Sequence, residues 1–190
     1  MLTLKHINEQ IVLGLLDLSL FQLQQPNLPK RELEKQGSLF LLKHLFNDQR
    51  VNIQYSQSGK PYIENRSEHI SISHSHDRLA LIVNKTHNTG VDIELIRDKV
   101  KQVKHKFLNA AEALAAGESI EHLIRFWAAK ETLYKIYGLK ELDFIENLAV
   151  EDFEDNKIIG KITKHHFHQK QLLHWEKLGQ YILVYSVHEI

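Results

Sequence analysis

The chain has 190 residues, of which 43% are hydrophobic and 25% are charged, so it can bury a full core and is not disordered throughout. Its 24 basic and 24 acidic side chains cancel, which excludes a general electrostatic attraction to nucleic acid or to a membrane surface. Because it has no cysteine, a disulfide framework and a thiolate zinc site are also excluded.

The N-terminal segment carries no recognisable targeting signal. Its first six residues lack the basic and then apolar pattern of a signal peptide. The apolar run at residues 11–20 is too short to span a bilayer. We therefore expect a cytoplasmic protein with no membrane partner.

Two helices are predicted before the first strand. Residues 7–20 carry leucines on one side and predict a helix. After a break, Pro29 favours the start of a second helix that reaches about Phe46. Residues 51–55 then alternate like a strand and lead into a turn that ends in Gly59.

Three strands are predicted next. Residues 70–73 alternate strictly, so the isoleucines face a core and the serines face the opposite side. The apolar run at residues 79–84 is typical of a central strand. In residues 90–94 the alternation places Asp92 and Glu94 together on the face away from the core.

The two carboxylates of Asp92 and Glu94 allow two interpretations. Side by side they repel each other, which is costly unless a cation lies between them. Oxygen ligands on one face are what a hard divalent metal requires. An exposed strand on which water solvates both acids explains the pattern equally well.

The segment at residues 97–107 is the one locally basic stretch in this neutral sequence. A run of this kind is usually a solvated helix face, and a docking surface for an acidic partner is the functional alternative. Residues 109–112 then match a capping box at the start of a short helix. The basic residues of the stretch are Arg97, Lys99, Lys101, Lys104 and Lys106.

A long amphipathic helix is predicted over residues 119–137. Its apolar residues recur at spacings of three, four and seven. Ser119 is suited to cap its start, and Gly138 stands where a left-handed C-terminal cap is expected. The helix also carries Glu131 and Lys135, which are four apart and can form a surface salt bridge.

Histidines are numerous, at 13, and the densest group is at residues 165–168. On a strand only His166 and His168 share a side, so we expect a solvated edge strand there and not a metal site.

The C-terminal part is predicted to be rich in strands, at residues 148–153, 157–162, 171–175 and 181–188, with a turn at Asp155. The order of elements predicts an α+β fold of two similar α/β halves packed with pseudo-twofold symmetry. Each half is expected to pack a long helix against a roughly three-stranded antiparallel sheet. We expect the halves to span residues 1–96 and 97–190, with a ligand pocket between them.

Four segments together resemble the motifs of a known enzyme family. They read GKPY at 59–62, ISISHS at 70–75, GVDIE at 90–94 and WAAKETLYK at 127–135. In this order and at these separations they are similar to the 4′-phosphopantetheinyl transferases. The likeness is to the larger, pseudo-dimeric type that activates surfactin synthetase and other peptide and polyketide synthases as well as fatty-acid carriers.

The resemblance implies transfer of phosphopantetheine from coenzyme A to a serine of a carrier protein, with release of adenosine 3′,5′-bisphosphate. It also implies a Mg²⁺ cofactor, with Mn²⁺ as a substitute. The implied metal ligands are Asp92, Glu94 and Glu131, and Glu131 is in addition the implied base that acts on the carrier serine.

The resemblance further implies a set of phosphate contacts. Lys130 and Lys135 would hold the phosphates of coenzyme A, and Lys130 would assist the leaving group. Ser73 and His74 would contact phosphates as well. The expected catalytic residues are then Glu131, Lys130 and Asp92.

Lys60 and Pro61 would line the adenine site of coenzyme A on the same grounds. The resemblance also implies an arginine that binds the 3′-phosphate from the helix at residues 31–42. No arginine stands near Leu39, so Arg31, Lys30 or Lys35 would have to serve.

The expected partner is an apo acyl, peptidyl or aryl carrier protein that docks near Arg97, Lys101 and Lys104 on a monomeric enzyme. Nucleic acid is not expected as a partner. One alternative is a carrier- or nucleotide-binding module that has lost catalysis, although the acidic residues and lysines of the motifs are intact. Another is a metal-dependent hydrolase with zinc on His74, His76 and Asp92, which lacks a convincing third histidine.

Overall fold

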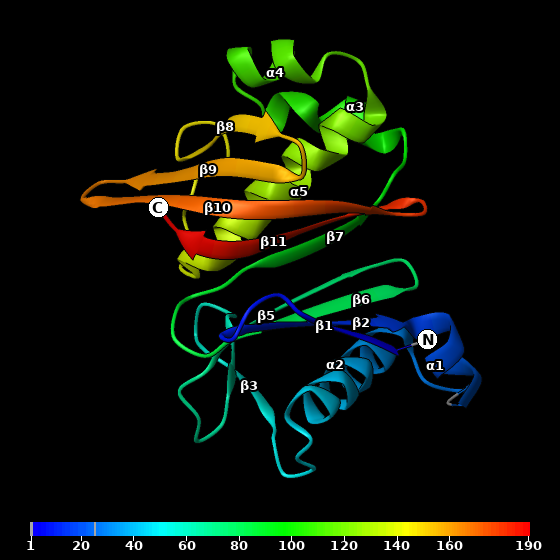
Figure 1. Ribbon diagram of the computed structural model, residues 1–190. Helices are drawn as coiled ribbons and strands as arrows, with labels where there is room; N and C mark the ends of the chain where they lie inside the picture. The colour runs from blue at the N-terminus through cyan, green and yellow to red at the C-terminus, as the bar shows by residue number, and fades with distance from the viewer. Residues whose placement is uncertain (1, 25) are drawn as a thin grey trace.

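A computed structural model describes residues 2–24 and 26–190 as a mixed α+β protein with two antiparallel sheets (Figure 1). The long helix α2 covers the outer face of the first sheet, and α5 covers the outer face of the second (Figure 1). The predicted class, α+β with two α/β halves, is confirmed.

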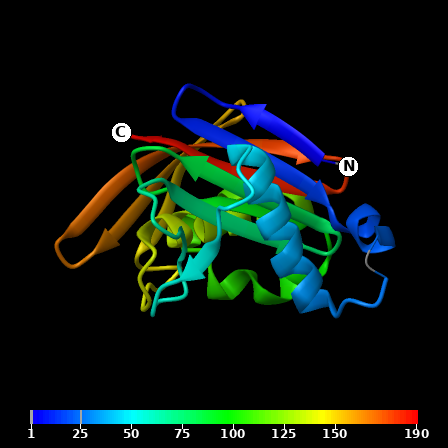
Figure 2. The same cartoon turned by 90° about the horizontal axis from the view of Figure 1, so that it is seen from below.

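The first half contains the sheet β1-β2-β6-β5-β4-β3, which has six strands within the described residues. Seen from below, α2 crosses this sheet diagonally (Figure 2). The elements are β1 (Leu2–His6), β2 (Ile11–Asp17), α1 (Leu18–Gln24), α2 (Lys30–Phe46), β3 (Ile53–Tyr55), β4 (Pro61–Ile63), β5 (His69–Ser75) and β6 (Arg78–Asn84).

The second half contains the sheet β7-β11-β10-β9-β8, which has five strands within the described residues. The change of sheet therefore falls between β6 and β7, ahead of residue 97. The elements are β7 (Val91–Leu95), α3 (Lys99–Val103), the 3₁₀ turn η1 (Lys104–Lys106), α4 (Ala110–Ala116), α5 (Ile120–Tyr137), β8 (Leu148–Glu154), β9 (Lys157–Lys164), β10 (Phe167–Leu178) and β11 (Tyr181–Glu189).

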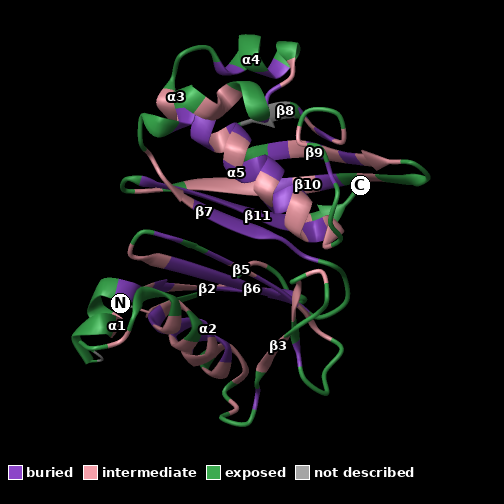
Figure 3. Cartoon of the chain, turned by 180° about the vertical axis from the view of Figure 1, so that it is seen from behind, coloured by how far each residue is buried: buried purple, intermediate pink, exposed green. Residues whose placement is uncertain are grey.

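The two sheets pack face to face, so their inner strands are buried on both sides. On β11, Leu183 faces the first sheet, whereas Ile182 and Val184 face α5. This explains why β11 is a continuous apolar run and does not alternate. Figure 3 shows the buried residues along β7 and β11, in contrast to the exposed surface of α4.

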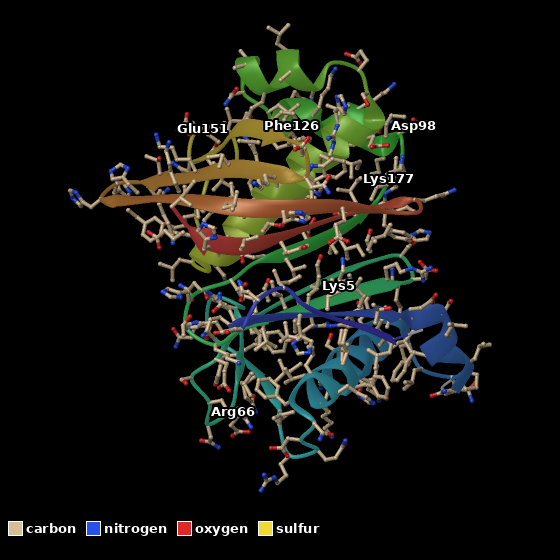
Figure 4. All side chains as sticks on the ribbon, viewed as in Figure 1. Lys5, Arg66, Asp98, Phe126, Glu151 and Lys177 are labelled. Carbon is tan, nitrogen blue, oxygen red and sulfur yellow. The ribbon has the colours of Figure 1, made fainter. Side chains whose placement is uncertain are left out.

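Polar contacts also join the halves. Lys5 of β1 lies between the sheets in Figure 4, and its Nζ donates a hydrogen bond of 2.6 Å to Glu176 on β10. Arg78 of β6 lies over the ring of Tyr181 on β11, with its guanidinium carbon 5.5 Å from the ring centroid.

The helix predicted over residues 7–20 is wrong. Residues 11–17 form β2, and the helix α1 begins only at Leu18. Its start is marked by Asp17, whose carboxylate accepts hydrogen bonds from the amide and hydroxyl of Ser19. A short apolar run fits both a helix and a strand that is buried on both faces, so its periodicity cannot separate them.

Most other elements are confirmed. Helix α5 begins after Ser119, whose hydroxyl accepts from the amide of His122, and it ends at the left-handed Gly138. Asn109 forms the predicted capping box with Glu112. Residues 165–166 form the turn between β9 and β10, so the edge strand predicted for residues 165–168 is wrong there. A hairpin turn leaves these polar residues exposed in the same way as an edge would. Phe167 and His168 do begin β10, where it pairs with β9 alone.

Within residues 2–24 and 26–190, the structure contains no helix that is both long and apolar enough to cross a membrane.

Candidate functional site

Strand β7 joins the two halves through a ladder of serines on β5. It is the edge strand of the second sheet, so its outward amides have no partner within that sheet. These amides donate to alternate serine hydroxyls at 3.2 or 3.3 Å, in the pairs Val91–Ser71, Ile93–Ser73 and Leu95–Ser75. From Ser71 to Ser75, every second residue of β5 is thus a serine whose hydroxyl faces every second amide of β7.

The same serines orient the two carboxylates of β7. The Ser73 hydroxyl donates to Asp92 Oδ1 at 2.7 Å, and the Ser75 hydroxyl donates to Glu94 Oε2 at 2.9 Å. Each hydroxyl thus accepts from one residue of β7 and donates to the preceding one. This double use fixes both carboxylates on the face that looks toward α5.

Helix α5 brings further groups to these carboxylates. Trp127 Nε1 donates to Glu94 Oε1 at 3.0 Å, and Lys135 Nζ donates to Asp92 Oδ1 at 2.7 Å. The close approach requires Gly90, because a Cβ there would lie 2.3 Å from the carbonyl oxygen of Thr132.

Glu131 lies close enough to the carboxylates of Asp92 and Glu94 for their charges to shift its pKa. Burial and the charge of Asp92 raise the pKa of Glu131 to about 7, with Glu94 adding to the effect and Lys135 opposing it. Burial and Asp92 raise the pKa of Glu94 as well. The three acids therefore form one electrostatically coupled cluster, although they come from separate segments of the chain.

This cluster predicts a pH dependence of stability in the metal-free protein. The folded state holds the Glu131 proton more tightly than the unfolded state, because the pKa rises from 4.5 to about 7. The contribution of Glu131 to the free energy of unfolding is therefore greatest below pH 4.5. It decreases by on the order of 3 kcal/mol between pH 4.5 and pH 7, so the folded state becomes less stable as the pH rises. In EDTA, Glu131→Gln should raise the free energy of unfolding at pH 8 and change it little at pH 4.5. An equal change at both pH values would contradict the assignment.

The donor set suits a hard cation. Asp92 Oδ2 is buried and has no hydrogen-bond partner among the described residues. A cation would satisfy this oxygen and remove the repulsion within the cluster, and carboxylate oxygens are the ligands that Mg²⁺ prefers. Within residues 2–24 and 26–190, however, no group of three or more histidine or acidic side chains is already gathered closely enough to hold a metal.

A pocket of about 870 Å³ opens between the two halves, and one of its lining residues, Lys135, is bonded to Asp92 of the cluster. Its walls come from α2, the turn before β4, strand β5 and the C-terminal end of α5. Five of the residues predicted to bind coenzyme A line it, namely Arg31, Lys60, Pro61, His74 and Lys135.

The pocket is rich in cations. Arg31 and Lys35 are exposed on α2, and Lys135 reaches in from α5. His74 Nδ1 lies 3.3 Å from Glu34 Oε1 on the pocket wall. The cationic side chains make this pocket suitable for a phosphorylated ligand.

Lys60 also connects the halves. Its Nζ donates to Asn88 Oδ1 at 3.0 Å and to the carbonyl oxygen of Ile136 at 3.3 Å, near the end of α5. Ser58 donates to the carbonyl oxygen of Gly138 at 2.8 Å. Burial lowers the pKa of Lys60. The pocket turn is therefore attached to the C-terminal end of the helix that carries Glu131.

Two residues that sequence reasoning placed on coenzyme A do not line the pocket. Ser73 is buried between the sheets with its hydroxyl bonded to Asp92. Lys130 is 0% exposed, and its ammonium is bonded to Glu112 and to the carbonyl oxygens of Phe107 and Phe144. A phosphate contact would require this ammonium to face the pocket.

Sequence reasoning missed the role of Glu112 and the contact between Trp127 and Glu94. The capping box identified Glu112 only as a local helix cap. Its ion pair with Lys130, at 2.6 Å, joins two residues that are 18 apart in the sequence and lie on different helices. No periodic pattern in the sequence predicts such a contact.

A protein-family model described as the 4′-phosphopantetheinyl transferase superfamily matches residues 88–186. The matched region includes β7 and α5, which carry the carboxylates, and reaches into β11. No curated protein matches the chain.

Proposed function

Since the chain belongs to the 4′-phosphopantetheinyl transferase superfamily, we propose that it transfers phosphopantetheine from coenzyme A to a serine of an apo carrier protein. The other product is adenosine 3′,5′-bisphosphate. The proposal depends chiefly on one observation: Lys135 lines the cationic pocket between the halves and donates a hydrogen bond to Asp92, one of the clustered carboxylates.

The two-half architecture supports the larger, pseudo-dimeric type. The family match covers the second half, and the first half adds its own sheet and long helix to the same chain. Because the pocket takes walls from both halves, one chain supplies a complete site. We therefore propose that the enzyme acts as a monomer. We also propose that it acts in the cytoplasm, as expected from the sequence.

Coenzyme A would occupy the pocket. Arg31 or Lys35 would bind the 3′-phosphate, and His74 and Lys135 would bind the pyrophosphate. Lys60, with Pro61 beside it in the chain, would border the adenine. These cations come from both halves, so binding of coenzyme A should also hold the halves together.

Asp92, Glu94 and Glu131 would hold Mg²⁺, or Mn²⁺ in its place. When bound, the metal would neutralise negative charge on the pyrophosphate as the bond breaks. The unpartnered Asp92 Oδ2 and the raised pKa of Glu131 support this assignment.

Glu131 is the proposed general base. It would accept the proton of the carrier serine as the serine oxygen bonds to the phosphorus of phosphopantetheine. The bond from that phosphorus to the bridging oxygen breaks, and the oxygen leaves on the adenosine bisphosphate. In the metal-free protein, burial and the neighbouring acids raise the pKa of Glu131 to about 7, and a bound cation would lower this pKa and keep the carboxylate ionised and able to accept a proton.

Labelling of an apo carrier protein by a fluorescent coenzyme A, with and without Mg²⁺, tests the function. We expect Mg²⁺-dependent labelling that is lost when the carrier serine is replaced by alanine. A panel of acyl, peptidyl and aryl carriers identifies the substrate. No labelling of any carrier would favour an inactive binding module, and zinc found by elemental analysis would favour a hydrolase.

The basic stretch is the proposed docking surface for the acidic carrier. Arg97 and Lys101 are exposed, and Lys104 Nζ lies 2.6 Å from Glu118 Oε1. Reversal of charge at Lys101 and Lys104 should raise the KM for the carrier about tenfold and leave the KM for coenzyme A unchanged. Lys85→Glu, outside this stretch, is the control. Equal effects on both KM values, or no effect on either, would show that the carrier does not dock on the basic stretch.

A further inference from the structure

Lys130 is a fully buried cation with all of its donors in use. Its Nζ donates to Glu112 Oε2 at 2.6 Å, to Phe107 O at 2.6 Å and to Phe144 O at 2.8 Å. An ammonium has three donors, so none remains for a ligand. Burial lowers the pKa of Lys130, and Glu112 opposes this shift.

Glu112 is equally occupied. Its Oε2 also accepts from the amide of Asn109 at 2.9 Å, and its Oε1 accepts from the amide of Val150 at 2.9 Å. The ion pair therefore ties the start of α4 and strand β8 to helix α5. A buried charge pair of this kind is retained only when its geometry and its hydrogen bonds are nearly complete.

The two carbonyl groups held by Lys130 belong to residues whose rings contact Trp127. The Phe107 ring meets Trp127 edge-on, with centroids 5.1 Å apart, and the Phe144 ring stacks on it at 5.5 Å and 17°. Phe107 is the last residue of the basic stretch, and Phe144 lies in the connection from α5 to β8. By holding both backbones, Lys130 holds both rings against the indole.

Trp127 in turn orients Glu94. Its Nε1 donates to Glu94 Oε1 at 3.0 Å, and the other oxygen of this carboxylate accepts from Ser75. The contacts form one continuous path from the buried ion pair, through the two rings and the indole, to a carboxylate of the cluster.

We propose that Lys130 is a positioning residue: with Glu112 it fixes Phe107 and Phe144 around Trp127, and so sets the orientation of Glu94. This role replaces a direct contact between Lys130 and a phosphate of coenzyme A. It rests on the proposed function insofar as Glu94 is a ligand of the metal.

The pair is removed together in the double variant Glu112→Gln with Lys130→Met, which leaves no unpaired charge and keeps an oxygen for the Val150 amide. We expect the apparent Mg²⁺ affinity in the labelling reaction to fall about tenfold or more, with the KM for coenzyme A unchanged. A raised KM for coenzyme A with unchanged Mg²⁺ affinity would show that Lys130 binds phosphate, and would overturn the proposal.

Phe144→Leu is the second variant, because it removes the stacking ring without touching a buried charge. It should weaken Mg²⁺ to a similar degree, and its combination with the double variant should add little. Fully additive losses would mean that the ring and the ion pair act separately, which overturns the proposed path.

The emission of Trp127 tests the inference without reference to activity. The sequence has two tryptophans, so a Trp175→Phe background isolates Trp127. We expect the double variant to shift this emission to the red and lower its anisotropy, and an unchanged spectrum would overturn the inference. If the emission shifts but the parent protein neither binds Mg²⁺ nor labels a carrier, the proposed function fails while the structural role of Lys130 stands.

Discussion

Glu131→Gln should lower the rate of phosphopantetheine transfer by at least about 10³-fold, because it removes both a proposed metal ligand and the proposed base. The fold should survive, since Glu131 is only partly buried and does not belong to an apolar core. The measurement is single-turnover labelling of the apo carrier at saturating Mg²⁺ and coenzyme A.

Glu121→Gln is the matched control on the same helix. Glu121 pairs with Lys177 at 2.5 Å on the surface and has no contact with the carboxylate cluster. This variant should retain the parent rate. Normal activity in Glu131→Gln would exclude Glu131 as ligand and as base, and the assignment of the site to this cluster would have to be abandoned.

Gly90→Ala should destabilise the protein by about 3 kcal/mol or more. The new Cβ would lie 2.3 Å from the carbonyl oxygen of Thr132 and 2.9 Å from Ile136 Cγ1, so β7 and α5 would have to move apart. Asp92 is on β7 and Glu131 is on α5, so this movement would also separate the two carboxylates. The transfer rate of the folded fraction should therefore fall as well. Chemical denaturation measures the first effect, and labelling of the folded protein measures the second.

Gly160→Ala is the matched control for a small change near α5. There the new Cβ would meet only the end of the Leu133 side chain, at 2.8 Å from Cδ1 and from Cδ2. A side chain can turn away where a backbone carbonyl cannot, so this change should cost about 1 kcal/mol. If Gly90→Ala were as stable as Gly160→Ala, the spacing of β7 and α5 would not depend on the glycine.

The most successful predictions concern segments with strong local signals. Helix α5 has a long apolar stripe, a serine at its start and a glycine at its end, and the structure begins and ends it at those residues. The serines of β5 and the acids of β7 alternate clearly, and this alternation was enough to predict that Asp92 and Glu94 share a face. In each case the information lies within a few residues, so no distant contact is needed.

The errors concern segments whose state depends on their neighbours. Residues 11–17 are apolar on both faces because the first sheet packs on α2 on one side and on the second sheet on the other. The first sheet was also predicted too small, at roughly three strands, because β1, β2 and the short β4 were not predicted as strands. Burial on both faces removes the period on which the interpretation depended.

From the sequence alone one could determine the family motifs, the main helix of each half and the face on which each acid lies, because helix and strand periods are local properties. Only the tertiary structure decided that Lys130 points into the core and Lys135 toward Asp92, although both stand on the same helix. Five residues along a helix turn a side chain by well over a full turn, so the two ammonium groups face different surroundings. Which surroundings each one meets depends on Glu112 and on β7, and those segments reach α5 only when the whole chain is folded.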